Sequence, residues 1–108
     1  MTKKEVQSII AAKATGYGFK LEENGVGWFA ERTDIGYISI RISEVTNDEK
    51  TDWEGRKVWT DIKASAFVCH MGGTPTPQEL LAAADEIARA ARMVAEIQDM
   101  KFSFVTEF

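Results

Sequence analysis

A long, alanine-rich amphipathic segment near the C-terminal end constrains the fold of this chain more than any other feature. It begins at Thr76 and Pro77, where threonine can cap a helix and proline suits the first helical position. Glu79 completes a capping box, and apolar residues recur at helical spacing as far as about Met100. The stripe expected to pack on a sheet is centred on Leu80, Ala84, Ile87, Ala91 and Val94, flanked by Ala83, Ala90 and Ile97 and by Ala88 and Ala95.

A shorter helix is predicted at the N-terminal end. Residues 2–5 read Thr-Lys-Lys-Glu, which is a second capping box. Three apolar residues follow at helical spacing: Val6, Ile9 and Ile10. We expect this helix to run from about Lys3 to Ala14, with Gly16 in the left-handed conformation that often ends a helix.

Four strands are predicted between the two helices. Alternating apolar and polar residues place them at 17–22, 26–32, 37–45 and 56–69. Asn24-Gly25 predicts a tight hairpin turn, and residues 33–36 predict a second turn. Fourteen residues are many for one strand, so a bend or bulge is expected near residues 64–66.

This order of elements predicts one α+β domain over residues 1–108. We expect a four-stranded antiparallel meander, or a five-stranded one, with the N- and C-terminal helices packed on one face. The face under the helices should present Leu21, Ile38, Ile40, Ile42, Val58, Ile62, Ala64 and Val68.

The apolar tail at residues 101–108 is expected to be docked, because a disordered tail rarely carries so many aromatic residues. It could add a fifth strand, cover the open face of the sheet, or cross to a second subunit. The residues expected to mediate self-association are Phe102, Phe104 and Phe108.

Charge and composition limit the classes of function. The formal net charge of −4 argues against a reader of duplex DNA, which usually carries a basic patch. The single cysteine, Cys69, allows no intrachain disulfide and favours a reducing compartment. Neither a signal peptide nor an apolar run near 18 residues is present, so we expect a cytoplasmic protein with no membrane contact.

No residue pattern indicates catalysis or a cofactor. Cys69 and His70 are adjacent on a predicted strand and point to opposite faces, and no second His or Cys exists to complete a zinc site. Phosphate-binding loops and nucleophile motifs are also missing from the sequence. We therefore expect no cofactor, no metal and no enzymatic activity. The weakest alternative is a small enzyme that uses Asp61, His70 or Glu31 in an intersubunit cleft.

The face of the sheet away from the helices is the first candidate interaction surface. Its aromatic and basic residues are expected to be Phe29, Tyr37, Arg41, Trp59, Lys63 and Phe67, with Glu31 among them. An open aromatic face favours a protein interface. Stacking of single-stranded nucleic acid on these rings is the alternative. It is disfavoured by the net charge and by the lack of an RNA-binding motif.

An acidic loop between the third and fourth strands is the second candidate surface. It contains Asp48, Glu49, Asp52, Trp53 and Glu54. The spacing does not match a calcium-binding EF-hand loop, and a solvated loop is the simplest interpretation. A tryptophan between two acidic residues could also anchor a basic partner surface, or equally cover the edge of the core.

These observations predict a non-catalytic protein-binding module, an adaptor or an inhibitor that occludes the surface of a protein partner of unknown identity. A homodimer is expected, with the aromatic sheet face or the tail at its interface. The most specific hypothesis is a phage-type inhibitor of a host enzyme that handles nucleic acid. That hypothesis rests on what small acidic proteins commonly do, and not on any residue of this chain.

Overall fold

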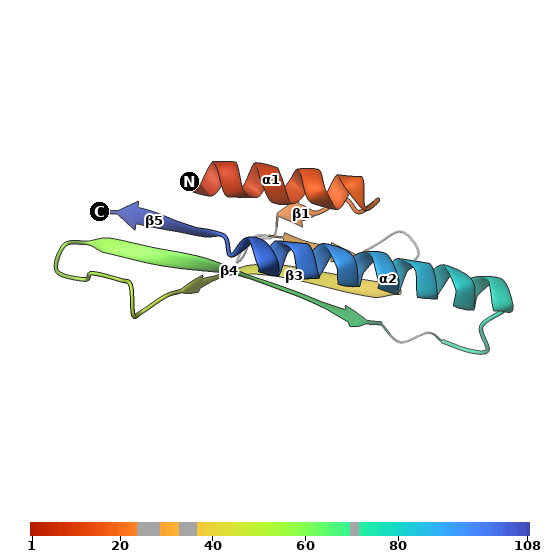
Figure 1. Ribbon diagram of the computed structural model, residues 1–108. Coiled ribbons are helices and arrows are strands. Elements are labelled where there is room, and N and C mark those ends of the chain that lie inside the picture. Colours follow the sequence, from red (N-terminus) through yellow and green to blue (C-terminus); the bar gives the residue numbers. More distant parts are fainter. Residues whose placement is uncertain (24–28, 33–36, 70–71) are drawn as a thin grey trace.

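The computed structural model describes residues 1–23, 29–32, 37–69 and 72–108 (Figure 1). Its elements are α1 (Lys3–Gly16), β1 (Glu22–Glu23), β2 (Phe29–Arg32), β3 (Ile38–Thr46), β4 (Lys57–Val68), α2 (Pro77–Met100) and β5 (Ser103–Glu107). Hydrogen-bonded neighbours follow the order β1-β2-β3-β4-β5, and each pair is antiparallel. The predicted α+β class, with two helices and an antiparallel sheet, is confirmed.

The predicted number of strands, four or five, stays a prediction because β1 and β2 are short and adjoin ranges outside the description. The turns predicted at Asn24-Gly25 and at 33–36 also lie outside the described residues. The long, continuous part of the sheet is formed by β3, β4 and β5.

α2 begins where its capping signals predict, and it ends at Met100, as its apolar periodicity predicts. The hydroxyl of Thr76 accepts a hydrogen bond from the backbone N–H of Glu79 at 3.2 Å, and the Glu79 carboxylate accepts from the backbone N–H of Thr76 at 3.2 Å. The helix ends at Met100, followed by Lys101 in the left-handed region at φ 48°. The capping box is confirmed because it depends only on residues that are neighbours in the chain.

The buried side of α2 differs from the predicted one. Its buried residues are Ala83, Glu86, Ala90, Met93 and Ile97. Leu80 and Ile87, from the centre of the predicted stripe, are 53% and 37% exposed. The buried stripe is therefore turned by about 100°, the angle between successive helical residues. The reason is that α2 packs against α1 as well as the sheet, so its buried side faces between them.

α1 is longer than predicted, and a different glycine follows it. Gly16 is still helical, and the left-handed glycine is Gly18 at φ 82°. Tyr17 is the C-terminal cap of the helix, and Phe19 is buried in the core. The strand predicted over 17–22 is therefore wrong for most of its length, since β1 covers only Glu22–Glu23.

One core lies between the helices and one face of the sheet. It contains Val6, Ile10 and Ala14 of α1, Ala90, Met93 and Ile97 of α2, and Ile38, Ile40, Ile42 and Ala64 of the sheet. Because both helices share this core, they cover the same face. Leu21 and Ile62 pack against the core, and Val58 is half-buried. Val68 is on this face as predicted, since it pairs with the buried Ile38, but its side chain is 58% exposed.

The pairing of β3 with β4 is continuous. It runs from Ile38 opposite Val68 to Thr46 opposite Thr60 without an extra residue on either strand. The bulge predicted near 64–66 is therefore absent from this pairing. β5 pairs with the first residues of β4, so within this chain the tail lies in the sheet beside β4.

The molecule is elongated. Its Cα radius of gyration is 16.2 Å, whereas a compact domain of this length has about 13 Å. Figure 1 shows the end of β4 and the start of α2 together at the opposite end of the molecule from the two chain termini. We call this region, Ser65–Val68 with Pro77–Ile87, the arm. Its large apolar side chains are exposed: Phe67, Val68, Leu80, Leu81 and Ile87.

Candidate functional site

The outer edge of β4 is paired along its first half only. β5 pairs with it from Lys57 to Asp61. One residue further, the backbone N–H of Ile62 donates to the carbonyl of Phe102 at 3.2 Å. Beyond Ile62, no strand of the described ranges pairs with β4 on this side. The second half of β4 therefore has an open edge.

Backbone groups of the even-numbered residues point toward this open edge. The N–H of Ile62 points outward to the tail, and the carbonyl of Ala64 accepts from Gln98 Nε2 at 2.8 Å. The N–H of Cys69 points the other way and donates to Tyr37 of the β3 side at 2.7 Å. Because these directions alternate along a strand, the N–H and C=O groups of Ala66 and Val68 face outward. Such an edge is a template for another strand.

An apolar groove of about 300 Å³ lies between α2 and the sheet beside this edge, and Ile38 of β3 lines its inner side. β4 contributes Ala66, Phe67 and Val68, and α2 contributes Ile87, Ala91 and Val94. Every residue that lines the groove is apolar except Gln98. An extended segment laid along β4 would therefore place apolar side chains next to an uncharged wall.

A second cavity, of about 360 Å³, also borders this edge, and Gln98 lines both cavities. It is surrounded by Lys50, Lys63 and Lys101, with Asp61 and Ser103 in its wall. None of these lysines forms an ion pair within the described part of the chain. We call it the lysine pocket.

Two polar groups in the wall of the lysine pocket differ in their bonding. Asp61 Oδ2 accepts a hydrogen bond from Asn47 Nδ2 at 2.9 Å. The hydroxyl oxygen of Ser103 is buried and has no hydrogen-bond partner among the described residues. A buried hydroxyl without a partner costs free energy.

The predicted aromatic sheet face is not one continuous platform. Trp59 and Phe67 are eight residues apart on β4, which corresponds to about 26 Å. The guanidinium of Arg41 lies 5.8 Å from the ring centre of Phe67, and Lys50 Nζ lies 5.7 Å from that of Trp59. Tyr37 directly precedes β3 at the Phe67 end. The face thus divides into two aromatic–cation contacts.

Three other predicted site residues have side chains outside the described part of the chain. Phe29 and Glu31 belong to β2, where their backbones pair with Ile42 and Ile40. His70 lies outside the described residues altogether. Lys63, predicted to join the aromatic face, lines the lysine pocket.

The acidic loop lies at the far end of β4 from the arm. Asp52 and Lys57 exchange two backbone hydrogen bonds of 2.8 Å, and Asp52 Oδ1 accepts from the N–H of Gly55 at 2.9 Å. All five predicted residues are exposed: Asp48, Glu49, Asp52, Trp53 and Glu54. β4 spans about 36 Å from Lys57 to Val68, so the loop and the open edge are separate surfaces.

The three phenylalanines of the tail have different surroundings. Phe102 and Phe104 are buried in the core of their own chain, whereas Phe108 is exposed. The backbone N–H of Phe108 donates to the carbonyl of Arg56 at 3.0 Å. Of the three, only Phe108 can reach a second molecule without unpacking the core.

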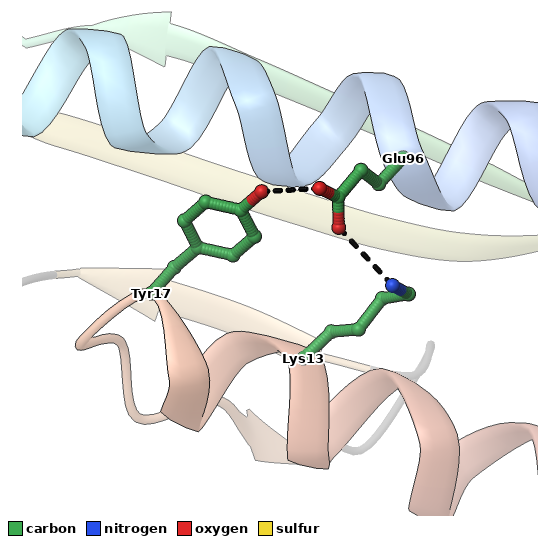
Figure 2. Close-up of polar contacts among 3 residues, drawn as sticks. All are labelled: Lys13, Tyr17 and Glu96. Carbon is green, nitrogen blue, oxygen red and sulfur yellow. Dashed lines mark hydrogen bonds and ion pairs between the residues drawn. The ribbon is translucent and has the colours of Figure 1, made fainter.

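A polar cluster joins α1 to α2 near the middle of the molecule (Figure 2). The hydroxyl of Tyr17 donates to Glu96 Oε1, and Lys13 Nζ lies 3.1 Å from Glu96 Oε2. The hydrogen bond from Tyr17, followed by that from Lys13, holds the pKa of Glu96 below its ordinary value. The same bond with Glu96 raises the pKa of the Tyr17 hydroxyl. These groups satisfy one another, so the cluster serves as a structural link between the helices.

The groove was not predicted from the sequence, although a signal for it exists. α2 carries apolar residues both on its buried stripe and at Leu80, Leu81 and Ile87, so the apolar arc is too wide for one packed face. A helix with such an arc has a second apolar side to cover. The open edge left no signal, because it depends on where β5 begins beside β4.

Three further findings concern metal binding, membrane spans and similarity to known proteins. In the described ranges, no three His, Cys, Asp or Glu residues are grouped so that they could hold a metal ion. No helix there has the length and apolar character needed to cross a membrane. Comparisons with family models, curated proteins and solved structures find no match to this chain.

Proposed function

We propose that this chain is a protein-binding module that adds an extended segment of a partner protein to the open edge of β4. The observation that carries the proposal is the outward backbone of Ala66 and Val68 beside an apolar groove. In this mode of recognition, main-chain hydrogen bonds supply affinity and side-chain pockets supply selectivity. The module needs no cofactor for this activity.

The lack of protection along the edge supports the proposal. Natural edge strands are usually protected by charged side chains, prolines or bulges. From Ala64 to Val68 the sequence is Ala-Ser-Ala-Phe-Val, with none of these features, and its pairing with β3 is regular. An unprotected edge next to exposed apolar side chains is a hazard for a free monomer, and a partner segment would remove it.

An adaptor and an inhibitor would use this edge in the same way, by covering a segment of the partner. The hypothesis of a phage-type inhibitor of a nucleic-acid enzyme stays a prediction. So does the homodimer, in which two copies would pair edge to edge. Molar mass from light scattering, measured with and without a bound peptide, separates the dimer from a complex with another protein.

The nucleic-acid alternative is less favoured. Arg41 and Lys50 lie over the rings of Phe67 and Trp59, which are the faces that bases would need. The enzyme alternative has no new support either, since Asp61 lies in the wall of the lysine pocket and accepts a hydrogen bond from Asn47.

The test begins with a displayed library of random seven-residue peptides, selected on the full-length protein. Peptides that are enriched are synthesised, and their Kd values are measured by fluorescence anisotropy. We expect amide exchange at Ala66 and Val68 to slow when such a peptide binds, because their N–H groups face the added strand.

Ala66→Pro is the decisive variant. It removes an N–H that faces the open edge and leaves the hydrogen bonds to β3 in place. We expect it to weaken peptide binding at least tenfold. Val68→Asn, which makes the groove polar, is a second variant in case the proline disturbs folding. The control is Val45→Asn, another exposed strand valine, which lies outside the groove. The proposal fails if no peptide is enriched. It also fails if Ala66→Pro and Val68→Asn both bind the peptides as tightly as the wild type does.

A further inference from the structure

We infer that the partner segment ends in a free C-terminal carboxylate, and that the lysine pocket receives it. This inference rests on the proposed function, because it names the chemistry at the end of the bound segment. It is carried by three features of the chain: the direction of β4, the position of β5 and the charges around the pocket.

The direction of an added strand decides which of its ends reaches the pocket. The open edge runs from Ala66 to Val68 at the end of β4, and the lysine pocket lies next to Ala64, whose outward carbonyl is bonded to Gln98. A segment antiparallel to β4 starts beside Val68 and finishes beside Ala66, toward the pocket. β3 and β5 are both antiparallel to β4, and this pairing is the more stable per residue. The C-terminal end of such a segment therefore meets the pocket.

A parallel segment would meet the same pocket with its other end. Its N-terminal amine would then face Lys63 and Lys101, and charges of the same sign repel. The electrostatics of the pocket thus favour the same direction as the hydrogen-bond geometry.

β5 explains why the segment should end rather than pass through. Ser103, the first residue of β5, pairs with Asp61 of β4, and Phe102 already accepts from the N–H of Ile62. An added strand cannot continue along β4 beyond the pocket, because the next stretch of edge is occupied. A chain terminus fits this geometry better than an internal residue, which would have to turn sharply away.

The charges in the lysine pocket suit a carboxylate. Three lysines and one aspartate line it, so its formal charge is three minus one, or +2. None of these lysines has an ion-pair partner in the described ranges. Hydrogen bonds from charged donors to a carboxylate are stronger than those between neutral groups.

A second copy of this chain does not supply such a group. The β4 segment from Ile62 to Cys69 contains no acidic residue and is internal to the chain. The C-terminal segment of this chain is already held in the sheet as β5, beside Lys57–Asp61. The occupant that fits the pocket is therefore the C-terminus of a different protein, with small or apolar residues before its last carboxylate.

The test uses acetyl-Val-Ala-Val-Ala as the probe, in two forms: one with a free C-terminal carboxylate and one with a carboxamide. Each is titrated into the full-length ¹⁵N-labelled protein and followed by NMR. We expect both forms to shift the amides of Ala66 and Val68. Only the free acid should also shift those of Lys63, Lys101 and Ser103, and it should bind about tenfold more tightly.

Two double variants show whether the lysines cause the difference. Lys63→Gln with Lys101→Gln should remove the advantage of the free acid. Lys4→Gln with Lys20→Gln changes the net charge equally, away from the pocket, and should preserve it. An acetyl-Val-Ala-Val-Asp carboxamide tests whether an internal acidic side chain can replace the terminus, and we expect it to bind like the neutral carboxamide.

The outcomes separate the two proposals. Equal binding of acid and carboxamide, with shifts at Ala66 and Val68, would overturn the carboxylate inference and leave strand addition intact. Equal binding of the aspartate peptide and the free acid would overturn the preference for a terminus. If neither peptide shifts Ala66 or Val68, strand addition itself fails, and the inference fails with it.

Discussion

The two halves of β4 differ in what lies along the outer edge of the strand, although β3 pairs with residues of both. The first half, Lys57–Asp61, is paired with β5 along its whole length, its last residues Thr60 and Asp61 also pair with β3, and Phe104 of β5 is buried in the core. The second half, Ala64–Val68, has β3 on one side only, and its last two side chains are 48% and 58% exposed. The difference follows from where β5 begins: Ser103 lies opposite Asp61, and β5 then runs toward Lys57, away from the second half.

α2 repeats the same contrast. Its C-terminal half places Ala90, Met93 and Ile97 in the core, whereas Leu80 and Leu81 near its start are exposed. The end of the molecule that holds the tail is therefore a packed domain, and the arm is an apolar surface without a cover. We expect stability to depend on the first region and binding to depend on the second.

The largest expected effect tests that division directly. Phe104→Ala should lower the free energy of unfolding by about 3–5 kcal/mol, because it leaves a cavity in the core beside β4. Phe67→Ala in the second half should cost under about 1 kcal/mol, since that ring is half exposed. Urea unfolding followed by circular dichroism measures both. Similar losses in the two variants would contradict the comparison.

A smaller effect is expected where α1 turns toward the core. Gly18→Ala should cost about 1–3 kcal/mol, because φ is 82° and the added Cβ would lie 2.9 Å from Arg89 Nη1. Gly16→Ala is the matched control, since Gly16 is helical and has no atom within 4 Å of the added Cβ. It should be neutral or stabilising by up to about 1 kcal/mol. Thermal unfolding of both variants checks the order, and an equal loss in both would disprove it.

The helix cap at the arm should have a smaller, more local effect. Thr76→Ala removes the capping hydroxyl and should cost about 1 kcal/mol. Because the start of α2 is exposed, faster amide exchange should be confined to the first turns of α2. Thr74→Ala, a neighbouring exposed threonine outside the cap, should change stability by less than about 0.5 kcal/mol. Faster exchange throughout the core would show that the arm and the domain unfold together.

The smallest expected effect concerns pH. The pKa of Glu96 is lowered from 4.5 by the hydrogen bonds from Tyr17 and Lys13, so the charged form is favoured in the folded state. Its contribution to stability is present above pH 4.5 and is lost as pH falls through the lower folded pKa. Glu96→Gln should therefore flatten the loss of stability below pH 4.5. Asp99→Asn, on the same helix, is the control. Identical acid profiles for wild type and Glu96→Gln would refute the link.

Much of the fold could be predicted because its signals are local. The capping box of α2 depends on residues three apart, and the alternation of Ile38, Ile40 and Ile42 predicts a strand with one buried face. At α1 the predicted box is only half formed, because the Glu5 carboxylate accepts from the Thr2 hydroxyl and not from its backbone N–H. The candidate site could not be predicted in the same way. Neither the edge at Ala66 nor the pocket at Lys101 exists until α2 and β5 are placed beside β4.

The predictions that were wrong, for the glycine after α1 and for the buried side of α2, also failed because of tertiary contacts. Gly18 rather than Gly16 takes the left-handed position, because Phe19 must turn into the core. Glu86 is fully buried on a stripe that hydrophobicity alone would not choose, because α2 packs against both α1 and the sheet. In each case a tertiary contact overrides a local preference.

The sequence by itself determined the class of fold, the limits of α2 and the inward face of β3, because capping and periodicity act between near neighbours. Only the tertiary structure decided which side of α2 is buried, how far β5 covers β4, and where three lysines meet. These features depend on distant segments competing for the same apolar surface, and that competition is settled only when the whole chain packs.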